Sequence, residues 1–252
     1  MHEHTAADDY AASWDARYSE SDRLWSGEPN AALVREAADL APGTALDLGS
    51  GEGGDAIWLA RRGWRVTGVD ISRVALERAA AHVREAGVAD SVELRHCDLG
   101  AEFPEGRFDL VSAHFLHAHG GLPREDILRR AAAAVAPGGV LLVVGHSRNA
   151  SMGHLDHEQR MSLPTAEEDL AVLELAEGRW EVLRCEEYEH TYTGADGEST
   201  RVDTVVKVRR RPRGAAGGGA PPGAGGAGRG GAPPRRPAPV RGRRLSRLRG
   251  RR

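Results

Sequence analysis

Short apolar segments alternate with amphipathic ones from Thr44 onward, and this alternation restricts the chain to few folds. Apolar residues recur at helical spacing in the longer segments, whereas the short segments are the apolar runs typical of buried strands. Strands that alternate with helices form a parallel sheet with helices on both faces. We expect strands at 44–48, 65–70, 92–97, 108–113 and 140–144, and helices at 55–62, 73–86 and 123–135.

A different pattern follows these segments. Thr165 and Glu168 form a capping-box motif, which predicts a helix over 166–176. Two further strands are expected, at 180–188 and 201–209. Because Asp196-Gly197 between them is a typical hairpin turn, these strands should pair antiparallel. The predicted fold class is therefore α/β, a Rossmann-like doubly wound seven-stranded sheet with a C-terminal antiparallel hairpin.

Composition divides the 252 residues into three parts. Residues 1–43, with helical patterns at 6–18 and 30–40, are expected to form an N-terminal lid, and residues 44–211 the core. Residues 212–252 consist almost entirely of Gly, Ala, Pro and Arg, which bury too little apolar surface to offset the entropy of ordering. We expect this tail to be disordered.

Charge is distributed unevenly between the core and the tail. The whole chain has a net charge of −3, and the tail holds eleven arginines and no acidic residue, so the rest carries −14. An acidic body repels a phosphate backbone, so nucleic acid is an expected partner only through the tail. A non-catalytic nucleic-acid-binding protein that uses this tail is therefore one alternative function.

The cysteines and the hydropathy indicate the compartment. Cys97 and Cys185 are too few for a disulfide framework and lack the spacing of a zinc site. No apolar run approaches the roughly 18 residues of a membrane span. These features predict a cytoplasmic protein without a membrane partner.

A glycine-rich turn, "LDLGSGEGG", follows the first expected strand. Gly49, Gly51 and Gly54 satisfy GxGxxG, a pattern in which backbone approaches a ligand closely and a helix N-terminus offers N–H groups to an anion. Asp47 would repel a pyrophosphate but attract an ammonium group. The pattern favours S-adenosylmethionine, a cation with a zwitterionic amino acid moiety, over NAD. A NAD-dependent reductase is the alternative enzyme.

Two more acidic residues follow the second and third strands. Asp70 is placed to accept both hydroxyls of a ribose, and Asp98 to accept the adenine amine. Ile71 and Leu99 are expected to sandwich the adenine ring. Ligands of open α/β sheets bind at the carboxyl ends of the strands, so these residues and the glycine turn should form one site.

Several segments, in order, resemble the motifs of class I S-adenosylmethionine-dependent methyltransferases: "LDLGSGEG", "VTGVDIS", "HCDL" and "VAPGGVLLVV". The segment "WDARYSESDRLWSGEPN" is similar to the tellurite-resistance and thiopurine methyltransferase branch, in which aromatic residues close over the cofactor. Ser50 stands where many members have cysteine. The resemblance implies S-adenosylmethionine as cofactor, with contacts at Trp14, Trp25, Asp47, Gly49, Ser50, Gly51, Asp70, Ile71, Asp98, Leu99 and Ala113.

The expected methyl acceptor is a small molecule with a soft (S, Se, Te) or anionic nucleophile, which needs no protein base. The alternative is an O- or N-methyltransferase of a natural product that uses a histidine base. His114, which "HFLHAHGG" groups with His117 and His119, is the candidate base. No metal is expected, because no carboxylate or cysteine joins this cluster locally. His190 and Arg201 match a His and Arg region of the same branch and are candidate substrate-binding residues.

Overall fold

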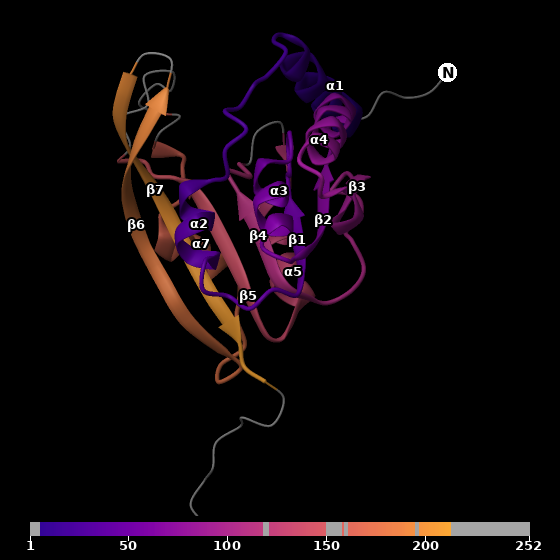
Figure 1. The fold of residues 1–252 in the computed structure, drawn as a ribbon. Helices are drawn as coiled ribbons and strands as arrows, with labels where there is room; N and C mark the ends of the chain where they lie inside the picture. The colour runs from indigo at the N-terminus through magenta and orange to yellow at the C-terminus, as the bar shows by residue number, and fades with distance from the viewer. Residues whose placement is uncertain (1–5, 118–120, 150–157, 159–160, 195–196, 213–252) are drawn as a thin grey trace, which may run out of the picture. The chain divides into compact units, whose positions relative to one another are not determined.

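The computed structural model describes residues 6–117, 121–149, 158, 161–194 and 197–212 (Figure 1). These residues belong to one compact unit, Met1–Ala216. Three predictions lie outside the described residues: the disorder of the tail, the hairpin turn at Asp196, and the position of His119. Within the described part, none of the helices has the length and apolar character needed to traverse a bilayer.

The described residues form a seven-stranded sheet in the order β3-β2-β1-β4-β5-β7-β6. The strands are β1 (Thr44–Leu48), β2 (Arg65–Asp70), β3 (Val92–His96), β4 (Phe108–His114), β5 (Val135–His146), β6 (Trp180–Gly194) and β7 (Gly197–Arg210). β1 to β5 pair in parallel, and β7 lies antiparallel between β5 and β6. The predicted fold class, with its C-terminal antiparallel hairpin, is confirmed.

Helices cover both faces of this sheet, as Figure 1 shows. They are α1 (Ala6–Ser19), α2 (Ala31–Ala37), α3 (Gly54–Arg61), α4 (Arg73–Glu85), α5 (Arg124–Ala134) and α7 (Ala166–Val172), with a short 3₁₀ turn at Ala89–Ser91. α2 and α3 pack with one set of buried strand residues, and α5 and α7 pack with the set on the opposite face. The alternation of side chains along each strand separates these two cores.

Capping residues set two of the helix starts as expected. The Ser72 hydroxyl accepts the Ala75 N–H at the start of α4, and Thr165 and Glu168 form the predicted capping box of α7. α7 ends earlier than expected, before Glu174, whose φ of +47° is left-handed and interrupts a helix. The hairpin strands β6 and β7 are longer than expected because their pairing continues from Trp180 to Gly194.

A row of polar side chains crosses the carboxyl edge of the sheet on the face that carries α2 and α3. Asp47, His114, His146 and Asp203 each continue the alternation of strand residues buried in that core. Strands β1, β4, β5 and β7 are consecutive in the sheet, so they bring to one edge residues that are far apart in the sequence. This row forms the floor of the candidate site.

Candidate active site

A cavity of about 1100 Å³ lies at this carboxyl edge, and α1 and the loop after it contribute to its wall. The residues predicted for cofactor, substrate or catalysis that line it are Trp14, Trp25, Asp47, Gly49, Ser50, Gly51, Asp70, Ile71, Leu99, His114, His190 and Arg201. His117 also lines the cavity. The structure therefore brings these predicted residues together, and the role of each stays a prediction.

The glycine turn is anchored on β2. Its φ angles of +73° at Gly49 and +51° at Gly51 lie in the left-handed region that glycine favours. The N–H groups of Gly49 and Ser50 both donate to Val69 O, and the Gly51 N–H donates to Asp70 Oδ2 at 2.8 Å. These three N–H groups are used within the protein, so an anion at this turn would have to be bound by the N–H groups at the start of α3. The glycine turn shapes the cavity wall and allows its backbone to approach a ligand closely.

Asp70 ends β2 at the cavity and is 8 % exposed. Its carboxylate accepts the Gly51 N–H and, through Oδ1, the Ser72 N–H at 2.9 Å. Burial raises the pKa of Asp70 above its ordinary value, and these N–H groups oppose the shift. A carboxylate oxygen has two lone pairs, so Asp70 keeps acceptor capacity for hydroxyl groups.

Two predicted cofactor contacts do not line the cavity. Ala113 is 1 % exposed and packs in the core on the face that carries α5 and α7, because strand alternation turns it away from His114. Asp98 is half-buried, and its Oδ1 accepts the Gly100 N–H at 2.9 Å, which shapes the turn after β3. Leu99 and Ile71 do line the cavity.

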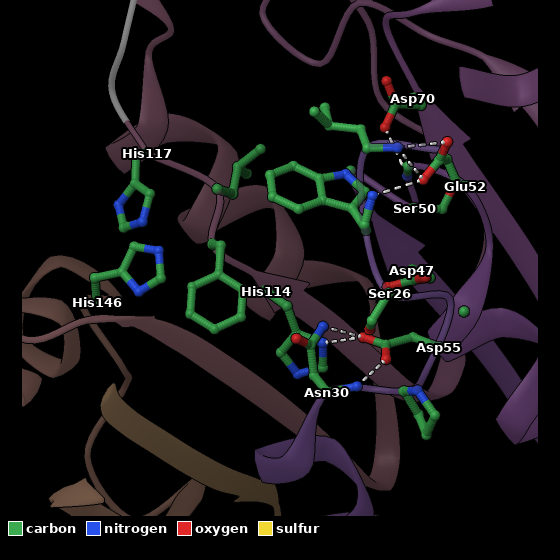
Figure 2. Close-up of a pocket in the computed structure, with 18 of the residues that line it drawn as sticks. Ser26, Asn30, Asp47, Ser50, Glu52, Asp55, Asp70, His114, His117 and His146 are labelled. Atoms are coloured by element: carbon green, nitrogen blue, oxygen red, sulfur yellow. Dashed lines mark hydrogen bonds and ion pairs between the residues drawn. The ribbon is translucent and has the colours of Figure 1, made fainter. Parts of the chain in front are cut away.

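Asp47 lies in an acid–histidine cluster that it forms with Asp55 and His114 (Figure 2). Its Oδ1 accepts the Ser112 hydroxyl at 3.0 Å, and its Oδ2 is buried without a partner among the described residues. Burial, followed by the charge of Asp55, raises the pKa of Asp47 to about 7. A buried acceptor that lacks a donor suits a cationic ligand.

Asp55 is the hub of this cluster and was not singled out from the sequence. It lies in the first turn of α3 and accepts both the backbone and the side-chain N–H groups of Asn30 at 2.7 Å. His114 Nδ1 donates to its Oδ2 at 2.6 Å. Burial raises the pKa of Asp55, but His114 and Asn30 outweigh it and bring the pKa below its ordinary value.

His114 is therefore held by Asp55 through a hydrogen bond at Nδ1. Burial lowers its pKa, but Asp55 and then Asp47 outweigh that effect and raise it. The side chain is 3 % exposed, and Nε2 is buried without a hydrogen-bond partner in the described part of the chain. A ring that is this buried and is held by Asp55 offers little surface to a substrate. His114 fits a positioning role better than that of a base.

The three groups of the cluster also lie within 4.8 Å of one another, close enough to hold a metal ion. The sequence shows no carboxylate near His114, but folding brings Asp47 and Asp55 to it. Both oxygens of Asp55 already accept hydrogen bonds from Asn30 or His114. The geometry is that of a hydrogen-bonded network, and a metal would have to displace these donors.

Aromatic residues of the lid stand over the glycine turn. The Trp25 Nε1–H donates to the Tyr18 hydroxyl at 3.0 Å, and a Cβ on Gly51 would meet that hydroxyl at 3.0 Å. Glu52 is 3 % exposed and fixes the loop by accepting the Trp25 N–H at 2.9 Å. Trp14 packs on Tyr18 with ring centroids 6.0 Å apart. The lid is thus tied to the turn that it covers.

A second group of polar residues lies at the cavity, and the sequence indicated only one of its members, His190. Asp203 on β7 is 3 % exposed and pairs with His146 on β5 and with His190 on β6. The available signal was the carboxylate of Asp203 in the valine-rich strand pattern "VDTVVKV". We call His146, Asp203 and His190 the histidine pair site, and all three line the cavity.

This architecture is that of class I methyltransferases: the sheet order, the antiparallel β7 and a ligand cavity beside the glycine turn. Residues 45–139 match the sequence model of the family described as a methyltransferase domain. Residues 45–139 thus form a methyltransferase domain, and S-adenosylmethionine is its expected cofactor. The family match decides against the nicotinamide alternative.

Curated relatives agree with this family. The chain is 37 % identical over 118 residues to ubiquinone biosynthesis O-methyltransferase of Ralstonia nicotianae, an alignment that covers 46 % of this chain and 49 % of that protein. It is 31 % identical over 127 residues to tRNA 5-carboxymethoxyuridine methyltransferase of Escherichia coli, which covers 48 % of each chain. The chain spans about half the length of the curated relatives it matches.

Solved structures extend the likeness to the whole fold. A protein studied for conversion of a disulfide bond into a thioacetal group during echinomycin biosynthesis superposes with a TM-score of 0.63 at 26 % identity, covering 81 % of this chain and 93 % of that one. TehB from Haemophilus influenzae gives a TM-score of 0.57 at 15 % identity, covering 78 % and 66 %. The second likeness shows a common fold alone.

Proposed function

We propose that the chain transfers a methyl group from S-adenosylmethionine to a small molecule with a soft or anionic nucleophile. The observation that carries the proposal is the Asp47 carboxylate, buried beside the glycine turn with one oxygen unpaired among the described residues. A cation is the natural partner for such a group. Asp47 would hold the ammonium group of the cofactor, and Asp70 would hold its ribose hydroxyls.

The cofactor supplies an electrophilic methyl group on a sulfonium, so the protein's task is mainly to position the acceptor and exclude water. The lid residues Trp14 and Trp25 would enclose the reacting groups. Through the Asp55 ion pair, His114 would fix the floor of the site at the end of β4. This division of roles needs no base for an acceptor that is already ionised.

Three observations support a small acceptor. The solved relative at 26 % identity was studied for chemistry at sulfur, the conversion of a disulfide bond into a thioacetal group. The cavity of about 1100 Å³ suits a cofactor together with a small second ligand. The body of the chain carries −14, which disfavours a phosphate backbone. Membership in the tellurite-resistance and thiopurine branch remains part of the proposal.

Calorimetric titration with S-adenosylmethionine, S-adenosylhomocysteine and NADH tests the cofactor assignment. We expect the first two to bind, and Asp70→Ala to weaken binding by at least tenfold, because it removes charge-assisted hydrogen bonds worth about 1.5–3 kcal/mol. Asp90→Ala is the matched control, since Asp90 is an exposed acid in the 3₁₀ turn outside the cavity. Unchanged affinity in Asp70→Ala would refute the assignment.

A panel of acceptors tests the second half of the proposal. Labelled cofactor is offered with thiols, selenite, tellurite and phenols, and with tRNA and histones as macromolecular controls. We expect label in the sulfur, selenium or tellurium compounds. Because one similar curated protein is a tRNA methyltransferase, the tRNA arm is a direct competitor. Transfer confined to the macromolecules would contradict a small acceptor.

A further inference from the structure

We propose that the histidine pair site is the acceptor subsite and that His146 Nε2 removes the proton of a thiol acceptor. The inference rests on the proposed function and deepens it, because it adds a proton acceptor and an acceptor class. It concerns residues on β5, β6 and β7, apart from the Asp47, Asp55 and His114 cluster.

Strand register builds the site. His146 lies directly opposite Asp203 across β5 and β7, and Tyr188 lies opposite Asp203 across β7 and β6. His190 lies two residues beyond Tyr188 on the same face of β6. The rings of these two residues stack with their centroids 5.3 Å apart. Asp203 is thus flanked by a histidine on each neighbouring strand, at the cross-strand and diagonal positions where side chains meet.

The carboxylate of Asp203 fixes the tautomers of both rings. His146 Nδ1 lies 3.3 Å from Asp203 Oδ1, and His190 Nε2 lies 2.7 Å from Asp203 Oδ2. An ionised carboxylate only accepts, so each of these ring nitrogens carries the proton. The opposite nitrogen of a neutral ring then holds a lone pair. For His146, whose Nδ1 faces Asp203, the nitrogen with the lone pair is Nε2.

His146 is the better placed of the two rings. β5 is the direct neighbour of β4, whereas β6 is at the edge of the sheet, farther from the glycine turn. Phe115 packs on the His146 ring with centroids 4.4 Å apart. The His117 ring stacks on the His146 ring at 5.1 Å, and both are labelled in Figure 2. The side chain is 22 % exposed and lines the cavity, in contrast to 3 % for His114.

This geometry favours a proton-bearing acceptor with a soft atom. The rings of Phe115 and His117, which both pack on His146, offer a polarisable wall, and His146 Nε2 offers a proton acceptor beside it. In the proposed step the thiol S–H bond breaks and its proton goes to Nε2. The sulfur lone pair forms the new S–CH₃ bond, and the electrons of the broken sulfonium C–S bond return to the cofactor sulfur. The products are a neutral thioether, neutral S-adenosylhomocysteine and a protonated His146.

Two thiols of similar size distinguish proton removal from other roles. One is an alkyl thiol whose pKa lies about two units above the assay pH, and the other is an aryl thiol already ionised at that pH. We expect His146→Gln to lower kcat for the alkyl thiol by about 100-fold and for the ionised thiol by less than threefold. His96→Gln, at an exposed histidine that ends β3 outside the cavity, should change neither rate.

Asp203→Asn tests the positioning role. We expect it to lower kcat for the alkyl thiol about tenfold at unchanged KM, because the neutral amide no longer holds the His146 tautomer. Titration of each variant with S-adenosylhomocysteine verifies that the cofactor site is intact.

Equal losses with both thiols in His146→Gln, or no loss with either, would overturn the inference while leaving the proposed function in place. Absence of methyl transfer to any thiol, with normal cofactor binding, would overturn it as well. Absence of cofactor binding in the unaltered protein would instead refute the proposed function itself.

Discussion

Asp47 is the residue whose surroundings depart most from those of an ordinary carboxylate. It is 2 % exposed, and among the described residues only the Ser112 hydroxyl donates to it. Burial and the nearby Asp55 raise its pKa to about 7, so near neutral pH it is partly protonated in the protein without ligand. A cation bound there favours the ionised form and lowers this pKa.

Cofactor binding near pH 7 is therefore expected to release protons. About half of the Asp47 carboxyls are protonated at that pH, so release should approach about 0.5 proton per cofactor bound. Calorimetry in two buffers of different ionisation enthalpy measures this number. Asp47→Asn should abolish the release and weaken binding. Proton uptake by the unaltered protein, or release that persists in the variant, would contradict the role of Asp47.

The same pKa shift predicts a pH-dependent stability. The pKa of Asp47 is higher in the folded state than the ordinary value of 3.8, so the folded state binds more protons between these values. The carboxylate thus destabilises the fold increasingly as pH rises from about 4 to 7. Asp47→Asn should raise the free energy of unfolding without ligand by about 4 kcal/mol at pH 8 and by almost nothing below pH 4. Urea unfolding of both proteins across this pH range measures the difference.

The sequence identified site residues that a neighbouring motif marks. It missed residues whose importance depends on contacts with distant parts of the chain. Asp47 and Asp70 end apolar strands beside a glycine turn, and both line the cavity as expected. Asp55 lies inside a helix pattern, and its importance arises from Asn30 and His114, which are far away in the sequence. Asp203 likewise becomes important only when β7 is inserted between β5 and β6.

At the scale of elements, one buried ion pair joins α5, α7 and the segment after β4. The Arg124 guanidinium donates to both oxygens of Asp169, the second at 3.0 Å, and its Nε–H donates to Leu116 O at 2.6 Å. Arg124 is 8 % exposed and Asp169 1 %. Leu116 lines the cavity next to Phe115, whose φ of +54° is unusual for a non-glycine residue. The ion pair therefore supports the acceptor side of the site.

Replacing only Arg124 should lower the free energy of unfolding more than replacing both Arg124 and Asp169. Arg124→Met leaves the Asp169 carboxylate buried without its partner, which should cost about 3–5 kcal/mol of unfolding free energy. The double variant Arg124→Met, Asp169→Leu replaces the pair by apolar groups and should recover at least half of that loss. Denaturant unfolding measures both. A double variant less stable than the single one would contradict this expectation. It would show that the loss in Arg124→Met does not come from the unpaired Asp169 carboxylate.

Elements were predicted well where local chemistry determines them. Ser72 and Thr165 cap their helices as expected, and β1 and β2 have the expected bounds. The ends of β5 and of the hairpin were not predictable, because they depend on pairing with neighbouring strands. The Pro-Gly-Gly segment looks like a connection before β5, but the strand begins earlier, at Val135. Val135 pairs with Phe108 on β4, and the register between the two strands shifts after this pair.

At the scale of the whole molecule, charge separates the two ends of the sequence. Residues up to Pro212 carry −14, and the following residues contain eleven arginines. The row of polar side chains at the carboxyl edge of the sheet lies entirely within the first part. Cofactor binding and acceptor chemistry should therefore be independent of the arginine-rich residues, whereas any attraction for RNA should depend on them.

A chain that ends at Pro212 tests this separation. We expect it to bind S-adenosylhomocysteine as tightly as the full chain and to methylate the same thiols at the same rate, since all of the described residues that line the cavity lie at or before Asp203. The full chain should bind a short RNA with an affinity that falls steeply between 50 and 200 mM salt, because about six or more arginine–phosphate contacts release counterions. The shortened chain should not bind RNA, because its net charge repels phosphate. Fluorescence anisotropy measures the RNA binding. Loss of thiol methylation in the shortened chain would contradict the separation, and tRNA methylation that survives the truncation would favour a nucleic-acid acceptor held by the folded core.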